Sequence, residues 1–182
     1  LYFLHSALLD QDRRDHFVPP EVWVGGGEEP LCIFRDPEGG KDALFLAAKG
    51  GRAADNHGNM DAGSFIFELN GVRWSVDPGN QGYHELEQIM GNELWDQAQD
   101  SRRWSLLTKN NFGHSTLTVN GEMHLADARV TMIPEGDKDS TPRAMFDLTP
   151  VFGNSLEQAR RSPVFWIYGY KRGAFWPFVP TG

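Results

Sequence analysis

The sequence predicts an all-β fold, mainly an antiparallel β-sandwich, with one or two short helices. Short apolar runs of strand length recur along the 182 residues, and 20 glycines and 11 prolines interrupt them. Six tryptophans, twelve phenylalanines and a hydrophobic fraction of 40% provide the side chains of a buried core. We therefore expect one β-sandwich domain at residues 19–182, after a segment at residues 1–18 that ends a preceding helical domain or forms a linker.

The charge and the cysteine content exclude several classes of protein. A net charge of −8 and a pI near 5.2 argue against a general nucleic-acid binder and against a protein that binds membrane surfaces. No apolar run approaches the roughly 18 residues of a membrane-spanning helix. The one cysteine, Cys32, cannot form an intramolecular disulfide, so cysteine usage leaves the cellular compartment open.

The first part of the chain predicts a helical segment followed by two strands. Residues 1–12 carry leucines at helical spacing, and Pro19 and Pro20 end any helix there. Residues 31–35 and 43–48 are apolar runs on either side of a loop rich in Gly and Asp. We expect both runs to be core strands of one hairpin.

A two-residue hairpin is the strongest local prediction. Asn70 and Gly71 suit a type I′ turn, in which both central residues need positive φ. This turn pairs residues 65–69 with residues 72–76, and it fixes their register. Six large apolar side chains then share one buried face in three facing pairs, which are Leu69 with Val72, Phe67 with Trp74, and Phe65 with Val76.

The open end of this hairpin gathers polar residues. Continued by two residues, the register sets Asp77 opposite Ser64, beside the loop that carries His57, Asn59 and Asp61. Polar side chains seldom converge without a metal, a ligand or a hydrogen-bond network that satisfies them. The residues alone leave two interpretations open, a metal or catalytic site around His57 and a structural network in a tight loop. The spacing matches no zinc finger, metalloprotease helix or EF-hand.

After the hairpin the pattern changes to a helix and then returns to strands. Tyr83–Met90 has helical spacing, and the residues after it extend the helix irregularly. Residues 115–119 form a predicted strand, and Asn120 with Gly121 suits a second type I′ turn that leads to residues 123–126. Further strands are predicted at residues 128–133, 144–148 and, as a buried aromatic strand, 162–170, with an exposed charged loop at residues 134–142.

Three stretches of the sequence resemble one known family. They are DNHGNMDAGSFIFELNGVRWSVDPG at residues 55–79, NNFGHSTLTVNG at residues 110–121 and DLTPVF at residues 147–152. They are similar to the β-sheet domain of the heparinase II/III-like polysaccharide lyases, and the likeness covers most of residues 43–165. In that family a helical toroid precedes an antiparallel β-sandwich, and an acidic polysaccharide binds in the cleft between them. The resemblance implies that this chain is the sandwich portion of a protein whose helical domain precedes it.

The resemblance also implies roles for individual residues. His57 aligns with the family's catalytic histidine, and Asn59 aligns with a second histidine that binds metal in many members. Asp77 and His114 align with two further metal ligands. An amide oxygen is a harder and weaker ligand for zinc than imidazole, so Asn59 implies loosely held zinc, calcium or an empty site. Asp61 is a candidate replacement ligand.

The chemistry that the resemblance implies is β-elimination from a uronate-containing polysaccharide. This reaction needs a group that neutralises the uronate carboxylate, a base for the C5 proton and an acid for the leaving oxygen. His57 serves as the base or as the donor to the carboxylate, and the helical domain supplies the other groups. Tyr83 either lines the cleft or packs within the fold. Arg102 and Arg103 either contact the anionic sugar or are solvated surface residues.

Two classes of function follow from these residues. The first is a polysaccharide lyase, periplasmic or secreted, whose sandwich portion alone is inactive and whose partners are an acidic polysaccharide and its own helical domain. The alternative is a non-catalytic carbohydrate-binding or structural β-sandwich. A metal-dependent hydrolase is a weaker third reading, because the sequence shows no carboxylate pair suited to activating water. A tyrosine-bearing helical toroid before this chain would favour the lyase.

Overall fold

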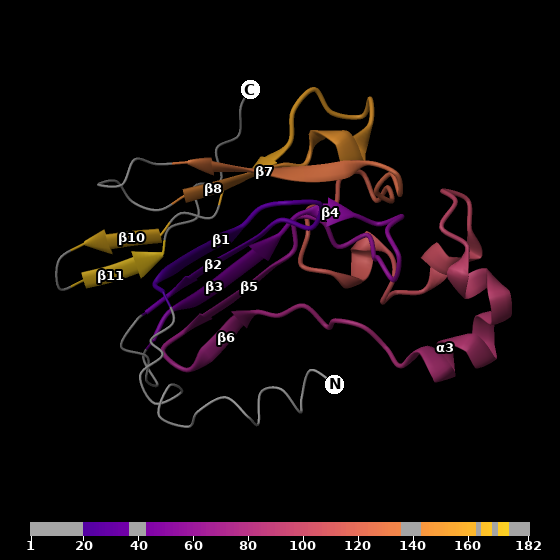
Figure 1. The fold of residues 1–182 in the computed structure, drawn as a ribbon, viewed down its shortest axis with the longest axis horizontal. Coiled ribbons are helices and arrows are strands. Elements are labelled where there is room, and N and C mark those ends of the chain that lie inside the picture. The colour runs from indigo at the N-terminus through magenta and orange to yellow at the C-terminus, as the bar shows by residue number, and fades with distance from the viewer. Residues whose placement is uncertain (1–19, 37–42, 136–142, 163–164, 169–170, 175–182) are drawn as a thin grey trace.

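The computed structural model describes residues 20–36, 43–135, 143–162, 165–168 and 171–174. Two antiparallel sheets lie face to face (Figure 1), which confirms the predicted sandwich. The first sheet has the strand order β1 (Val22–Gly25), β2 (Leu31–Arg35), β3 (Phe45–Lys49), β5 (Phe65–Leu69) and β6 (Val72–Ser75). The second has the order β4 (Gly51–Arg52), β7 (Arg129–Glu135), β8 (Arg143–Asp147) and β9 (Arg160–Arg161).

The core lies between these two sheets, and it is built by alternation along the strands. Every second residue of β2 and β3 is buried, and the residues between them are half-exposed on the outer face. Each fully buried Leu or Phe side chain contributes about 1.5–3 kcal/mol through removal of apolar surface from water. The inward side chains of the two sheets form one cluster that includes Cys32, Phe34, Leu46, Ala48, Val130, Ala144 and Phe146.

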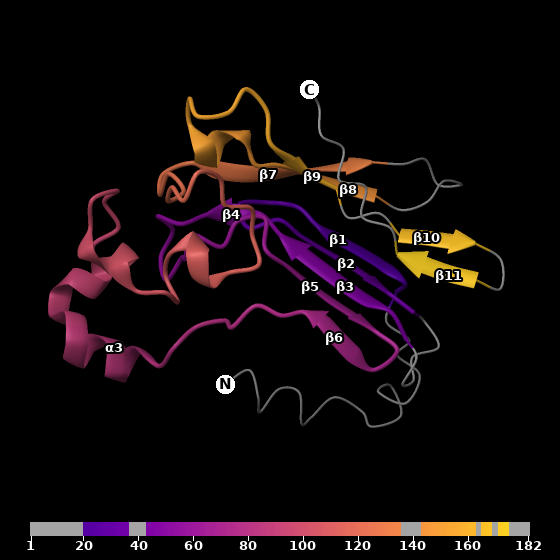
Figure 2. The ribbon, with the colours of Figure 1, turned by 180° about the vertical axis from the view of Figure 1, so that it is seen from behind.

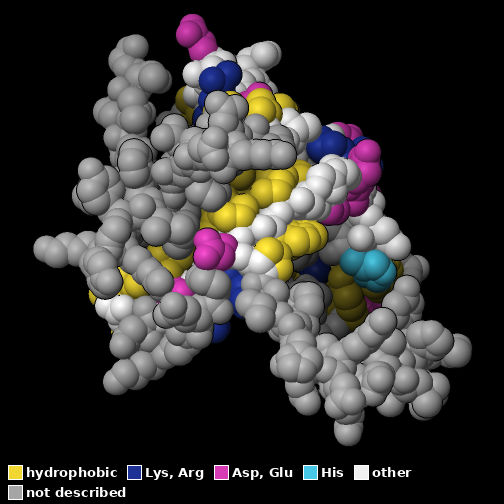
Figure 3. Space-filling model, turned by 60° about the vertical axis from the view of Figure 1, so that its left-hand side comes forward, with side chains coloured by type: hydrophobic (Ala, Val, Ile, Leu, Met, Phe, Trp, Pro, Cys, Tyr) yellow, Lys and Arg dark blue, Asp and Glu magenta, His cyan; other side chains and the backbone are white. Residues whose placement is uncertain are grey.

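The β2–β3 pair confirms the first predicted hairpin. The two strands are antiparallel, and Phe34 lies opposite Leu46 with both side chains in the core. The outer face of the first sheet is also partly apolar, and Trp23 on β1 is 45% exposed there. Figure 3 shows hydrophobic side chains gathered in a band on one face of the molecule, with acidic and basic side chains close together near one end of it.

The β5–β6 hairpin has the predicted turn but not the predicted register. Asn70 and Gly71 have φ values of 53° and 70°, as a type I′ turn requires. Beyond the Glu68–Arg73 pair the register shifts, and Phe67 lies opposite Ser75 instead of Trp74. The extra residue on β6 is a bulge, which occurs readily because β6 is the edge strand of its sheet.

The bulge overturns the expected six-residue buried face. The three apolar residues of β5 are half-buried and pack against the core. By contrast Val72, Trp74 and Val76 are 49%, 68% and 57% exposed. The expectation that Trp74 is a core residue was therefore wrong, because period-two patterning cannot distinguish a regular edge strand from a bulged one.

The predicted helix is present and lies at one end of the sandwich. It is α3 (Tyr83–Met90), and the 3-10 helix η1 (Gly91–Trp95) continues it as the irregular extension that we expected. Leu86, Met90 and Leu94 form a small buried cluster of their own. Figures 1 and 2 show this helical region at one end of the molecule, opposite the short β10 (Phe165–Tyr168) and β11 (Lys171–Ala174) pair.

The segment between the helix and β7 contains no strand where two were predicted, at residues 115–119 and 123–126. Its turn is present, since Asn120 and Gly121 have φ values of 54° and 70°. In this segment, side chains rather than a neighbouring strand form hydrogen bonds with the backbone N–H and C=O groups. The Asn111 amide, for example, donates to the carbonyl of Glu122 and accepts from the backbone N–H of His124. The short 3-10 helices η2 (Arg102–Ser105) and η3 (Asn111–Gly113) precede the turn.

The remaining predictions are met in part. β7 and β8 confirm the strands expected at residues 128–133 and 144–148, and η4 (Thr149–Phe152) and β9 follow them. β10 lies within the expected strand at 162–170, but its side-chain burial lies outside the described residues, as do residues 1–18 and most of the 134–142 loop. The domain boundary at residue 19 stays a prediction. In the described part of the chain, no helix has both the length and the apolar character to span a membrane.

Candidate functional site

The loop that follows β4 is fixed at its start by the Asp55 carboxylate. Arg52 donates to Asp55 Oδ1 at 2.6 Å, and Arg129 of β7 donates to Oδ2 at 3.0 Å. Partial burial acts to raise the pKa of Asp55, but the hydrogen bonds from Arg52 and the charge of Arg129 outweigh it, and the pKa lies below its usual value. These ion pairs hold the start of the loop to the second sheet at Asp55, two residues before His57.

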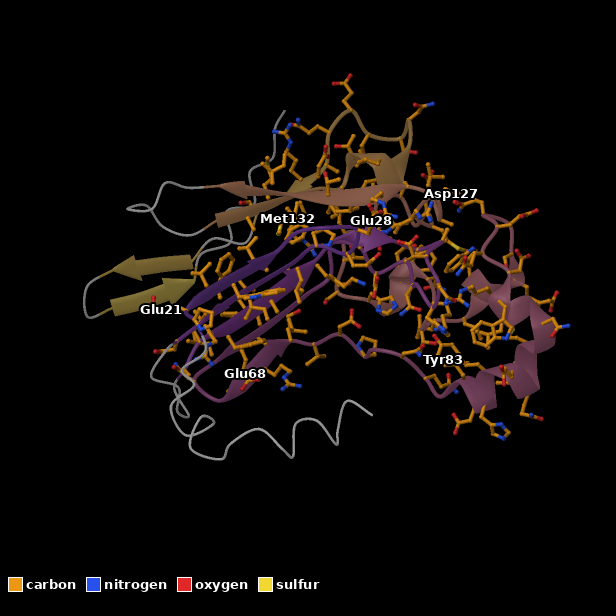
Figure 4. All side chains as sticks on the ribbon, in the orientation of Figure 1. Glu21, Glu28, Glu68, Tyr83, Asp127 and Met132 are labelled. Atoms are coloured by element: carbon orange, nitrogen blue, oxygen red, sulfur yellow. The ribbon has the colours of Figure 1, made fainter. Side chains whose placement is uncertain are left out.

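His57 is exposed and has a left-handed backbone with φ of 63°. A non-glycine residue in this region is uncommon, and it frequently marks a functional loop. Its ring centroid lies 5.2 Å from that of Tyr83 and 5.5 Å from that of Trp95, and both contacts are edge-to-face. Tyr83 and Trp95 stack on each other at 5.1 Å. Figure 4 shows Tyr83 at the start of α3, so the helical region holds this aromatic group against the loop.

Lys109 lies beneath this aromatic group, and its side chain is fully buried. Its Nζ donates to Asn59 Oδ1 at 3.0 Å and to Asn80 Oδ1 at 2.6 Å, and it lies 4.8 Å from the centroid of the Tyr83 ring. Burial, and next the charge of Arg103, lower the pKa of Lys109 to about 8. Sequence reasoning missed this residue, because it lies in a Lys-Asn-Asn turn that is typical of exposed loops.

Asp77 and His114 contact each other, as the resemblance implies. His114 Nδ1 lies 2.9 Å from Asp77 Oδ1 and 3.0 Å from Oδ2, and the backbone N–H groups of Gly79 and Ser115 donate to the same carboxylate. Burial acts to raise the pKa of Asp77, but the bond with His114 and the two backbone bonds outweigh it and lower the pKa. The bulged β6 thus still delivers Asp77 to the His114 loop.

The predicted metal ligands already have hydrogen-bond partners within the protein. The Asn59 oxygen accepts from Lys109, and Asp61, the candidate replacement, accepts from Lys49 at 2.8 Å. Within the described ranges, no three His, Cys, Asp or Glu side chains lie close enough to hold a metal ion. Structural and catalytic zinc sites use at least three protein ligands. Lysine ammonium groups at the Asn59 and Asp61 oxygens disfavour a metal ion at the same oxygens, and the metal site expected at Asn59, Asp77 and His114 stays a prediction.

The two arginines proposed for sugar binding have different environments. Arg103 is fully buried, and its guanidinium donates to the carbonyl oxygens of Leu94 and Gly58. This placement does not fit the expectation that Arg103 contacts substrate, because its donors are used to hold the His57 loop to the helical region. Arg102 is exposed and forms an ion pair with Glu93 at 2.8 Å.

A hollow of about 230 Å³ lies on the outer side of the first sheet, beside Asp77. Its apolar wall is formed by strand residues that include Leu31, Ala47 and Ile66. Its polar end contains Lys49 and Asp77. Its volume lies below the roughly 300 Å³ at which small-molecule sites usually begin.

One comparison with known proteins gives a match. Residues 33–145 match a family model described as Heparinase II/III-like, C-terminal. A comparison with curated proteins finds no match. The matched stretch contains His57, Asn59, Lys109, the Asp77–His114 pair and the aromatic group, so the geometry described above lies entirely within it.

Proposed function

This chain belongs to the heparinase II/III-like family, and from that membership we propose that it is the sandwich portion of a lyase for acidic polysaccharides. The observation that carries the proposal is the setting of His57. Its imidazole is exposed on a loop in the left-handed conformation, against an aromatic pair and above a buried cation. An imidazole can accept a proton at one ring nitrogen and donate one from the other, which suits proton transfer to and from a bound substrate.

The proposed reaction is β-elimination next to a uronate carboxylate. A base removes the C5 proton, the C4–O bond breaks, and an acid protonates the leaving sugar oxygen. The carbanion-like transition state needs positive charge or donors close to the carboxylate. We assign His57 either the base role or the role of donor to the carboxylate. The facing helical domain of the same protein would supply the remaining groups.

Substrate contact is proposed for the exposed aromatic surface next to His57. Trp95 is 41% exposed and its stacking on Tyr83 leaves an aromatic edge beside the imidazole. Aromatic side chains of this kind provide flat apolar area that fits the faces of sugar rings. Arg102, which is exposed, can reach an anionic sugar when it leaves Glu93. We also propose a periplasmic or secreted location, where such polymers are found.

The test is an elimination assay on the full natural protein. Unsaturated uronate absorbs in the ultraviolet, so heparan sulfate, alginate and similar polymers can be screened directly. We expect His57→Ala to lower kcat by about 10²–10⁴-fold, the usual contribution of a general acid or base. His84→Ala is the matched control, because His84 is an exposed histidine on α3 and is expected to keep full activity. A fully active His57→Ala variant would remove His57 from the mechanism.

The alternative is a carbohydrate-binding module without catalysis, and the exposed Trp95, which stacks on the half-buried Tyr83, favours it independently of His57. The two functions differ in one measurement. A binding module retains acidic oligosaccharide, with loss of affinity in Trp95→Ala, while no unsaturated product forms at any enzyme concentration. Product formation that depends on His57 supports the lyase.

A further inference from the structure

We propose that the Lys109 ammonium, and not a divalent metal ion, is the resident cation of this site and positions the groups around His57. The inference rests on the proposed function, and it disagrees with the three-ligand metal centre implied by the family resemblance. Lys109 is a positioning residue in this proposal. It acts on the reaction through Tyr83 and Asn59 and need not touch the substrate.

The first support is the number of segments that the ammonium joins. Asn59 belongs to the His57 loop, Asn80 follows β6, and Tyr83 begins α3. Both amide oxygens lie within 3.0 Å of Nζ, and the ring centroid lies 4.8 Å away. Charge-assisted hydrogen bonds are stronger than neutral ones, and a buried cation over an aromatic face adds further stabilisation. One side chain therefore holds three segments at the site.

The second support is the neutrality of the partners. Both hydrogen-bond acceptors of Nζ are uncharged amides, and its third neighbour is an aromatic ring. The positive charge is therefore partnered by dipoles without being cancelled by a contacting carboxylate. In a protein of net charge −8, Lys109 thus places a cation directly under the Tyr83 ring, close to where we propose that an anionic sugar binds.

The third support is that the oxygens of Asn59, Asp61 and Asp77 already accept hydrogen bonds from groups of the protein. A metal ion bound to Asn59 Oδ1 lies about 2.0–2.6 Å from that oxygen, which places it within roughly 6 Å of the Lys109 ammonium. The two cations would repel each other in a poorly solvated environment. Asp61 is paired with Lys49, and the Asp77 carboxylate accepts bonds from Gly79 and Ser115 while it faces His114. The side-chain oxygens of Asn59 and Asp61 thus already contact ammonium groups of the protein itself.

The route from Lys109 to the chemistry is short. Nζ lies under one ring, that of Tyr83, and the same ring contacts His57 at 5.2 Å. Removal of the ammonium frees Asn59, two residues after His57, and removes the support of the Tyr83 ring. We therefore expect the position of the imidazole to depend on Lys109, and kcat to fall more than the affinity for the polymer changes.

The experiment measures metal content and activity on the full natural protein, purified without chelator. We expect less than about 0.1 equivalent of zinc or calcium at this site, and a kcat that is unchanged by EDTA or by added zinc. Lys109→Met should lower kcat by about 10²-fold, the scale of a small misplacement of a catalytic group, and zinc should not restore it. Lys109→Arg keeps the charge and should recover part of the loss. Arg73→Met is the control, because it removes an exposed cation that is paired with Glu68 on the hairpin.

Each outcome decides the proposal. About one equivalent of a divalent metal that is lost in Asn59→Ala or in Asp77→Ala overturns it, and so does a folded Lys109→Met variant with full activity. Metal that both of these alanine variants retain lies elsewhere and leaves the proposal standing. If Lys109→Met does not fold, the metal content and chelator response of the unmodified protein still decide. The metal measurement is independent of the elimination assay, so a metal-free protein without lyase activity refutes the proposed function and not this inference.

Discussion

Buried cations hold the loops of this molecule, and they do so through oxygen atoms that carry no formal charge. Arg103 donates to two backbone carbonyls, and Lys109 donates to two side-chain amides. Arg161 donates to the carbonyls of Gly63 and Ser115 and lies over the Phe65 ring. Loops leave carbonyl groups without ladder partners, and a cationic donor satisfies two of them at once. These bonds accommodate the buried Arg103 and Lys109 and the half-buried Arg161 in a loop-rich sandwich.

Asp55 provides a residue-scale prediction about pH. Its pKa in the folded protein lies below its usual value, so the unfolded chain binds more protons over the interval between the two values. The stabilisation is therefore complete above the unfolded pKa of about 3.9 and is lost as the pH falls through the folded value. We expect Asp55→Asn to lower the free energy of unfolding by about 1 kcal/mol at neutral pH, because the carboxylate is partly exposed.

Urea unfolding of both proteins from about pH 7 to about pH 3 checks this prediction. The difference in stability should shrink toward the acid end, where the carboxylate of the unmodified protein becomes protonated. Asp100→Asn serves as control, since Asp100 is exposed. A constant difference at all pH values would show that the charge of Asp55 contributes nothing.

At the level of elements, the β5–β6 hairpin shows what local sequence can determine. Asn70 and Gly71 specify the turn, because few other residue pairs adopt positive φ twice in succession, and the structure has that turn. The bulge at Trp74 depends on neighbours instead. β6 has a partner on one side only, so an extra residue costs few ladder bonds. Likewise, the segment after His114 has strand-like residues, but the Asn111 amide takes over its backbone groups.

The bulged register gives a prediction about stability at the element scale. Trp74 is 68% exposed, so Trp74→Ala should change the free energy of unfolding by less than about 1 kcal/mol. In the predicted regular register the same substitution would cost about 3–5 kcal/mol. Phe146→Ala is the matched control, because Phe146 is fully buried between the sheets and should cost about 3–5 kcal/mol. Denaturant midpoints of the two variants measure the contrast. Similar decreases in the free energy of unfolding in both variants would show that Trp74 is a core residue.

At the scale of the whole molecule, the sequence was sufficient for the sandwich and for part of the site. The apolar runs at residues 31–35 and 43–48 predicted two core strands of one hairpin, and the β5–β6 hairpin carried Asp77 to His114 despite its bulge. Lys109 could not be predicted in the same way. Lys109 is buried because Asn59, Asn80 and Tyr83, which belong to separate segments, lie around it in the fold. No local sequence pattern predicts that these residues come together.

The proposed division of the site between the sandwich and a helical domain gives the last prediction. The sandwich presents His57 and Trp95 on an exposed surface, whereas elimination needs a base, an acid and a carboxylate partner around a single sugar ring. Holding such groups in place accounts for a large part of an enzyme's rate enhancement. One side of the site alone cannot hold all of them around the sugar, so that part of the rate enhancement is lost. An open surface is also wet, and water weakens the stabilisation of charge on the uronate.

We therefore expect the isolated sandwich to bind acidic oligosaccharide weakly and to release no unsaturated uronate, while the full natural protein releases it. Tryptophan fluorescence of the sandwich measures the binding, with Trp95→Ala as the variant that should lose the signal, and ultraviolet absorbance measures cleavage. Because Trp95 is on the sandwich and we propose that the helical domain supplies the catalytic groups other than His57, binding should survive separation of the domains and cleavage should not. Cleavage by the sandwich alone would mean that residues 20–174 contain the whole catalytic set, and the role proposed for the helical domain would then be wrong.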